Sequence, residues 1–223
     1  FNDTVGWWYS LASEDIDNDG DLDLVAGNLG LNSKYKTSED APFEVYVNDF
    51  DKNNRSDIVL SVTKNGKKLP LRGRECSSQQ IPMIKANFKT YDEFAKASLD
   101  EIYGSGMLNK SLHFEANTFS HFWFENKGEG KYERHELPTR SQFSAVNSIV
   151  FFDYDGDAYQ DILIAGNLYD TEVETPRSDA GIGLILQNNN GESFIPIPMS
   201  ESGLMVNKEV KSISKISLGK DKH

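Results

Sequence analysis

Short apolar segments separated by polar turns run along most of the chain and predict β-strands. The clearest of these segments are residues 24–28, 58–62 and 162–167, which are rich in Val, Ile and Leu. Their length and their β-branched content favour strands over helices. Residues 123–132 and 185–194 each place two apolar arms around a turn of Gly and Asn, which predicts two β-hairpins. We therefore expect an all-β fold.

One region departs from this pattern and predicts a small helical insertion at about residues 78–104. Thr90 followed by Glu93 is a capping box, apolar residues then recur at helical spacing, and Gly104 is a natural helix stop. A shorter helix is expected at about residues 79–87. The rest of the chain shows the alternation expected of strands and turns.

Three Asp-rich runs, at residues 15–23, 49–57 and 153–161, each come directly before one of the three apolar strands. A unit of strand, Asp-rich loop, strand and hairpin supplies about four strands, which is the make-up of a propeller blade. We predict a partial β-propeller of about three four-stranded blades with a helical insertion. The expected regions are a first blade at 1–43, a second with the insertion at 44–138, a third at 139–200, and the first strand of a further blade within 201–223, at 210–218.

Three blades cannot close a ring, because a propeller joins its first blade to its last. The chain also opens at Phe1 without an initiator Met. We therefore expect this sequence to be part of a longer protein that supplies the remaining blades.

Carboxylates at alternate positions of a tight loop predict calcium binding, because Ca²⁺ takes roughly six to eight oxygen ligands. A helical EF-hand would need Glu at the twelfth position, where these runs have Ala26, Leu60 and Ile164. We expect two to three Ca²⁺ ions, with Asp21, Arg55 and Tyr159 acting through backbone carbonyls. The full set of expected ligands is Asp15, Asp17, Asp19, Asp21, Asp23, Asp49, Asp51, Asn53, Arg55, Asp57, Asp153, Asp155, Asp157, Tyr159 and Asp161.

The alternative interpretation is that each run is an Asx-rich turn whose charges are solvated. Within the calcium hypothesis, Asn53 and the nearby cation of Arg55 predict weaker binding at the second run. Ala158 stands where the first run has Gly20. It predicts local strain there, unless Gly156 relocates the bend.

Composition narrows the possible partners. The formal net charge of −12 argues against nucleic-acid binding, which relies on Lys and Arg. The acidic excess gathers in the three runs and needs a local counter-charge. Cys76 is the single cysteine and forms no internal disulfide, and no apolar run predicts membrane insertion of this segment.

With these residues in view, the sequence resembles the FG-GAP/VCBS repeat family, whose pattern is alternating Asp residues, a Gly and a closing Asp. Residues 6–8, 27–32 and 165–169 resemble the C-terminal part of large bacterial VCBS proteins related to the ASPIC/UnbV and cartilage-acidic-protein group. Ala-Gly-Asn follows two strands where the family often has Gly-Ala-Pro, which argues against an integrin-like role. The resemblance implies a seven- or eight-bladed propeller with Ca²⁺ in its loops. It also implies an extracellular, outer-surface or periplasmic location and adhesion or ligand binding.

Two functional hypotheses follow. The first is a non-catalytic binding, adhesion or scaffold segment whose ligand is a glycan or a protein. The second is a carbohydrate-active hydrolase or lyase that uses the acidic loop at 170–179, where Glu172 and Glu174 lie near Arg177.

The aromatic residues Trp7, Trp8, Tyr9, Phe119 and Trp123 form either a ligand platform or packing between blades. The four histidines show no zinc spacing, and we expect them at the surface or in hairpins.

Overall fold

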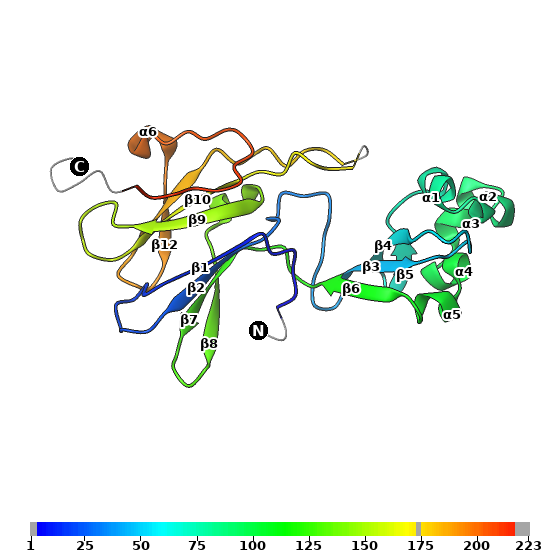
Figure 1. Cartoon of the computed structure of the whole chain (residues 1–223), viewed down its shortest axis with the longest axis horizontal. Helices are drawn as coiled ribbons and strands as arrows, with labels where there is room; N and C mark the ends of the chain where they lie inside the picture. Colours follow the sequence, from blue (N-terminus) through cyan, green and yellow to red (C-terminus); the bar gives the residue numbers. More distant parts are fainter. Residues whose placement is uncertain (1–3, 173–174, 217–223) are drawn as a thin grey trace. The chain divides into compact units, whose positions relative to one another are not determined.

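The computed structural model describes residues 4–172 and 175–216 (Figure 1). The described chain is mostly β, with three four-stranded antiparallel sheets and a small helical region. It divides into two compact units. Among the described residues, unit 1 comprises 7–34, 119–172 and 175–216, and unit 2 comprises 4–6 and 35–118.

Unit 1 contains two of the sheets. The first has the strand order β1-β2-β7-β8, and the second has the order β12-β11-β10-β9. Apolar side chains of both sheets, among them Val25, Trp123, Ile162 and Leu186, are buried in one common core. The strands are β1 (Ser10–Glu14), β2 (Asp23–Gly27), β7 (Phe122–Asn126), β8 (Tyr132–Glu136), β9 (Val146–Phe152), β10 (Asp161–Gly166), β11 (Leu184–Asn188) and β12 (Phe194–Ile197), with a 3₁₀ helix η1 (Thr139–Phe143) and α6 (Met199–Ser202).

The hairpin predicted at residues 123–132 is present as β7 and β8. We expected it in the same sheet as the strands that flank the second Asp-rich run, but it belongs to the sheet of β1 and β2. It pairs with β2, with Val25 opposite Trp123 and Ala26 opposite Phe122. The physical reason is burial, since the pairing covers the apolar side chains of β7 against β2. Residues 35–118 thus form a separate unit inserted between two neighbouring strands of one sheet.

Unit 2 contains the third sheet, with the strand order β5-β4-β3-β6. Its helices cover one face of that sheet, where Tyr46 and Val59 pack against Ile84, Phe94 and Leu99 (Figure 1). The elements are β3 (Phe43–Asn48), β4 (Asp57–Lys64), β5 (Lys67–Pro70), α1 (Arg74–Gln80), α2 (Met83–Asn87), α3 (Tyr91–Lys96), α4 (Leu99–Tyr103), α5 (Ser105–Leu108) and β6 (Leu112–Ala116).

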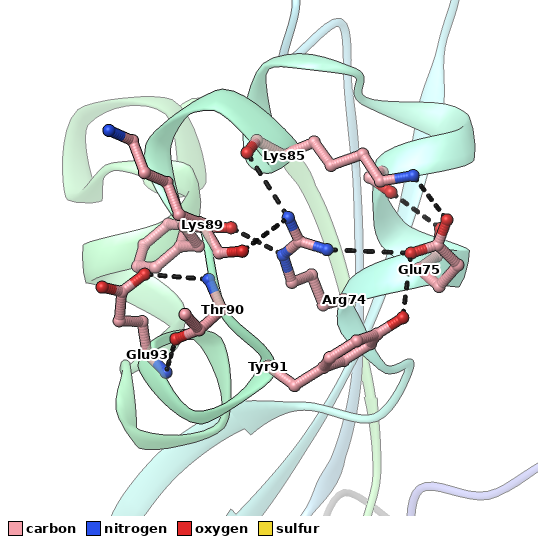
Figure 2. Close-up of polar contacts among 9 residues, drawn as sticks. Arg74, Glu75, Lys85, Lys89, Thr90, Tyr91 and Glu93 are labelled. Atoms are coloured by element: carbon pink, nitrogen blue, oxygen red, sulfur yellow. Dashed lines mark hydrogen bonds and ion pairs between the residues drawn. The ribbon is translucent and has the colours of Figure 1, made fainter.

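The helical insertion is present, but it consists of short helices. The predicted capping box of Thr90 and Glu93 starts α3, and a second box of Ser98 and Glu101 starts α4. The second box interrupts the longer helix that the apolar spacing suggested. Figure 2 shows how the buried Arg74 joins this region, because its guanidinium donates to the carbonyls of Phe88 and Lys89 at 2.6 and 3.3 Å.

The predicted strand at 210–218 differs from the structure over its described part, because residues 210–216 form no strand. Isolated hydrogen bonds join this segment to β9 and β10, from Val210 N to Gly166 O, from Asn147 Nδ2 to Val210 O and from Ile213 N to Ser148 Oγ. Leu218 lies outside the described residues. Among the described helices, none is both long and apolar enough to cross a membrane.

His121 is fully buried in unit 1, so the expectation of a surface or hairpin position was wrong. Its Nδ1 accepts from Asn28 N at 2.8 Å, and its Nε2 lies 3.0 Å from Ser144 O. These partners hold a neutral ring with the proton on Nε2. Burial lowers the pKa of His121 to about 4 from an ordinary value of 6.5.

This buried histidine predicts an acid sensitivity. Below pH 6.5 His121 is protonated in the unfolded chain, but in the folded chain it stays neutral until about pH 4. The folded state therefore loses stability relative to the unfolded state as the pH falls. The loss from this residue approaches about 3 kcal/mol near pH 4. Urea unfolding of the native chain and of His121→Gln at pH 7 and pH 4.5 measures it. We expect the variant to start less stable and to lose less on acidification; equal losses in both chains would contradict this origin.

Candidate metal-binding loops

The three Asp-rich runs form loops that join neighbouring antiparallel strands. Loop 1 (residues 15–23) lies between β1 and β2, loop 2 (49–57) between β3 and β4, and loop 3 (153–161) between β9 and β10. Each loop gathers three carboxylates, with one oxygen of each lying within 4.8 Å of the others. The triads are Asp15, Asp17 and Asp19 in loop 1, Asp49, Asp51 and Asp57 in loop 2, and Asp153, Asp155 and Asp161 in loop 3.

One hydrogen-bond pattern holds all three loops. The aspartate at the ninth position accepts from the backbone N–H of the second residue, at 2.9, 2.9 and 2.6 Å. The first-position aspartate accepts from the sixth N–H at 3.1, 2.9 and 3.2 Å. The side chain at the third loop position accepts from the backbone N–H of the fifth position. The side chain at the fifth position accepts from the backbone N–H of the seventh. The alternating spacing in the sequence therefore corresponds to a loop that orders its own side chains.

The ninth aspartate also ties its loop to a neighbouring hairpin in unit 1. Asp23 Oδ1 accepts from Asn126 N at 2.8 Å, and Asp161 Oδ1 accepts from Asn188 N at 2.7 Å. Asp23 stands outside the triad of loop 1, whereas Asp161, whose oxygens accept the equivalent two backbone bonds, is a member of the triad of loop 3. The role of Asp23 in the described geometry is to anchor the loop.

The loops concentrate negative charge in a partly buried place. Burial raises the pKa of Asp23, Asp57 and Asp161, and the neighbouring carboxylates of each loop raise it further. In loop 1, Asp15 Oδ1 and Asp21 Oδ1 are buried and have no hydrogen-bond partner among the described residues. An unpartnered buried carboxylate oxygen is costly unless a cation compensates it. A donor set made only of oxygen atoms fits Ca²⁺.

Loops 2 and 3 differ in detail from loop 1. Asn53 donates its side-chain N–H to Asp51 Oδ2 at 3.1 Å, so its amide nitrogen faces the triad. At the seventh position, Arg55 N donates to the side chain of Asn53, and Tyr159 N donates to that of Asp157. Asp157 is not a member of the loop 3 triad. The carbonyl ligands expected at the seventh position stay a prediction.

Two residues near the loops were missed by sequence reasoning. Gln187 on β11 donates to Asp155, and Glu125 on β7 lies close enough to Asp17 for like charge to raise the pKa of Asp17, after the larger effect of burial. Each residue stands directly before the Asn that bonds the ninth aspartate. Aligning the two predicted hairpins would have placed both residues at equivalent positions.

The sixth loop position takes left-handed backbone geometry in all three loops, with φ of 98° at Gly20, 65° at Asn54 and 72° at Ala158. The alternative that Gly156 relocates the bend was wrong, because Gly156 occupies the fourth position, which is also left-handed in the other loops. Ala158 therefore carries the strain that the sequence suggested.

Ala158→Gly is expected to stabilise unit 1 by up to about 1 kcal/mol, because glycine has no Cβ to clash at positive φ. The matched control is Gly20→Ala, which should cost a similar amount. No atom lies within 4 Å of a Cβ built at Gly20, so only the backbone geometry differs. Urea unfolding of both variants measures the effect, and a loss of stability in Ala158→Gly would contradict it.

The acidic loop at 170–179 was the candidate catalytic site, and its described side chains contact neighbouring residues of the chain. Glu172 pairs with Lys34 at 3.3 Å and accepts from Thr175 Oγ1, while Arg177 lies over the Tyr169 ring. Glu174 lies outside the described residues.

The aromatic residues divide between core and surface. Phe119 and Trp123 are buried, and Trp123 packs edge-on against Phe194 of the neighbouring sheet. Packing between sheets is therefore confirmed for Trp123, while Trp8 and Tyr9 stay partly exposed.

Comparison with known proteins supports the interpretation of loop 1. Residues 7–38, which contain β1, loop 1 and β2, match the model of the FG-GAP repeat. The Asp triads are of the kind typical of calcium sites in that repeat. No curated protein and no solved structure matches the chain.

Proposed function

We propose that this chain is a calcium-binding segment of a β-propeller in a secreted or cell-surface protein, and that it binds a glycan or protein ligand without catalysis. The observation that carries the proposal is the threefold recurrence of one loop architecture, each copy with a carboxylate triad before a buried strand. Isolated Asx turns would not need to repeat the same hydrogen bonds.

The arrangement of unit 1 supports the propeller. Its two four-stranded sheets share one core, as neighbouring blades do. The β11–β12 hairpin also meets loop 1, because Asn188 Nδ2 donates to Ile16 O at 2.8 Å and a Cβ on Gly191 would lie 2.6 Å from that of Asp17. An ion in loop 1 would therefore stiffen the contact between two sheets. The remaining blades of the ring would come from the parent protein.

Calcium chemistry supports the proposed location. Extracellular modules bind Ca²⁺ with Kd values of roughly 10⁻⁴ to 10⁻³ M, and millimolar calcium fills such sites. For the ligand, Trp8 and Tyr9 offer exposed aromatic surface in unit 1. Aromatic rings of this kind suit both sugars and protein side chains.

Calcium is expected to raise the stability of the chain strongly. At a hundredfold excess over Kd, each filled site adds about 2.7 kcal/mol to the folded state. Urea unfolding in EGTA, in Mg²⁺ and in Ca²⁺ measures this, with a smaller effect from Mg²⁺ because that ion demands tight octahedral geometry. Identical curves in EGTA and Ca²⁺ would refute the proposal.

A further inference from the structure

Four side chains on one face of the unit 2 sheet form a square that the calcium loops do not involve. Glu44 and Tyr46 on β3 lie opposite Glu115 and His113 on β6. Glu44, His113 and Glu115 each offer one ligand atom, and these atoms lie within 4.8 Å of one another. This group was not identified from the sequence, because strand pairing brings Glu44 and Tyr46 of β3 next to His113 and Glu115 of β6.

Glu44 is the centre of the square. Its side chain is only 1% exposed, and its Oε1 accepts from Lys68 Nζ at 2.6 Å and from Tyr46 OH at 2.8 Å. His113 Nε2 lies 3.0 Å from the same oxygen, and the His113 ring stacks on Tyr46 with centroids 4.4 Å apart. The stacking orients the imidazole toward Glu44, while His113 and Glu115 are open to solvent.

Two buried oxygens at this place have no hydrogen-bond partner among the described residues. One is Glu44 Oε2, and the other is Ser61 Oγ, whose residue is fully buried. Ser61 on β4 pairs directly with Glu44, so both side chains stand on the same face of the sheet. Buried polar atoms rarely stay unpartnered, and two adjacent ones indicate that something else supplies their contacts.

The donor chemistry decides which ligand fits. One imidazole nitrogen with two carboxylates suits a transition-metal dication such as Zn²⁺, whereas Ca²⁺ prefers oxygen alone. We propose that Glu44, His113 and Glu115 form a Zn²⁺ site, that Tyr46 positions the imidazole, and that Lys68 is the cation that the metal displaces. When Nε2 coordinates the metal, the neutral ring carries its proton on Nδ1.

Lys68 can compete with the metal for the Glu44 carboxylate and can move away from it into solvent. Its side chain is 47% exposed, so the ammonium has access to water once Glu44 binds a metal. Without metal, Lys68 compensates the buried charge of Glu44. Removing the lysine should therefore strengthen metal binding, which a purely structural ion pair would not predict.

Unit 1 contains a matched square that serves as a control. On β7 and β8, Glu125 lies opposite Glu133 and Trp123 opposite His135, with the two rings again 4.4 Å apart. Both Glu125 oxygens are partnered, one by Lys127 and the other by His135 at 3.1 Å. This square thus lacks the orphaned oxygens that mark the one around Glu44.

Calorimetric titration with Zn²⁺, in saturating Ca²⁺ so that the Asp loops are filled, tests the proposal on the full chain. We expect binding that His113→Asn weakens at least about tenfold, that Lys68→Gln strengthens, and that His135→Asn leaves unchanged. His113 is partly exposed, so His113→Asn should fold, and its unfolding curve without zinc checks this. Absent binding in the native chain, an unchanged affinity in His113→Asn, or weaker binding in Lys68→Gln would each overturn the proposal.

Discussion

Asp161→Ala is expected to destabilise unit 1 by about 3–5 kcal/mol in the presence of calcium. The carboxylate is buried and accepts from Tyr154 N at 2.6 Å and from Asn188 N at 2.7 Å. Its removal leaves two backbone donors without their partner, each worth about 1–3 kcal/mol when buried. The variant also loses one carboxylate of the loop 3 triad.

Urea unfolding in Ca²⁺ and in EGTA separates these two effects, because the donors are lost in both conditions and the ion only in calcium. Asp179→Ala is the matched control, since it removes the same charge from an exposed position of unit 1. The control should change stability by less than about 0.5 kcal/mol. A loss below about 1 kcal/mol for Asp161→Ala would mean that this aspartate does not anchor the loop.

Gly166→Ala is expected to be the most damaging steric change, with a loss of about 3 kcal/mol or more. A Cβ at this position would lie 1.9 Å from Ala145 O and 2.9 Å from Asn147 N. Both atoms belong to backbone at the start of β9, so relief requires moving β9 away from β10. Gly27, at the equivalent position of loop 1's strand, meets Val146 O at 2.4 Å.

The control for this change is Gly73→Ala. Gly73 has φ of −68°, and no atom lies within 4 Å of a Cβ built there. Thermal or urea unfolding of both variants should show a large loss for Gly166→Ala and little change for the control. Equal behaviour of the two variants would contradict the close approach of β9 and β10.

These glycines explain why Ala-Gly-Asn follows two of the predicted strands. Because glycine has no Cβ, the backbone of β9 can approach closely at Gly27 and Gly166. The asparagine that follows each glycine accepts hydrogen bonds from backbone N–H groups with its side chain. Asn28 Oδ1 accepts from Trp7 N and Leu29 N, and Asn167 Oδ1 accepts from Gly181 N. The residues were visible in the sequence, but their purpose depends on partners far along the chain.

Local features of the fold were predictable from sequence because they depend on neighbouring residues. The Asp spacing, the strand after each loop and the Thr90–Glu93 capping box involve contacts within a few positions. Pairings across long separations were not predictable in this way. The β7–β8 hairpin joins β2 across about a hundred residues, and local pattern carries no information on that choice.

The burial of polar residues was also not predictable from local sequence pattern. A histidine in a hairpin-rich chain is ordinarily exposed, yet His121 lies in the core because Asn28 and Ser144 satisfy both ring nitrogens. The square around Glu44 escaped notice for a related reason. Glu44 lies about seventy residues from His113 and Glu115 in the sequence, and it meets them only across paired strands.

The central claim is that the three Asp loops bind calcium, and counting bound ions tests it most directly. Equilibrium dialysis of the full chain against millimolar Ca²⁺, followed by metal analysis, should find two to three ions per chain. Asp17→Asn and Asp155→Asn, each changing one triad, should each lower the count by one, while the exposed Asp179→Asn should leave it unchanged. A native chain that binds no calcium, or triad variants that bind as much as the native chain, would contradict the account.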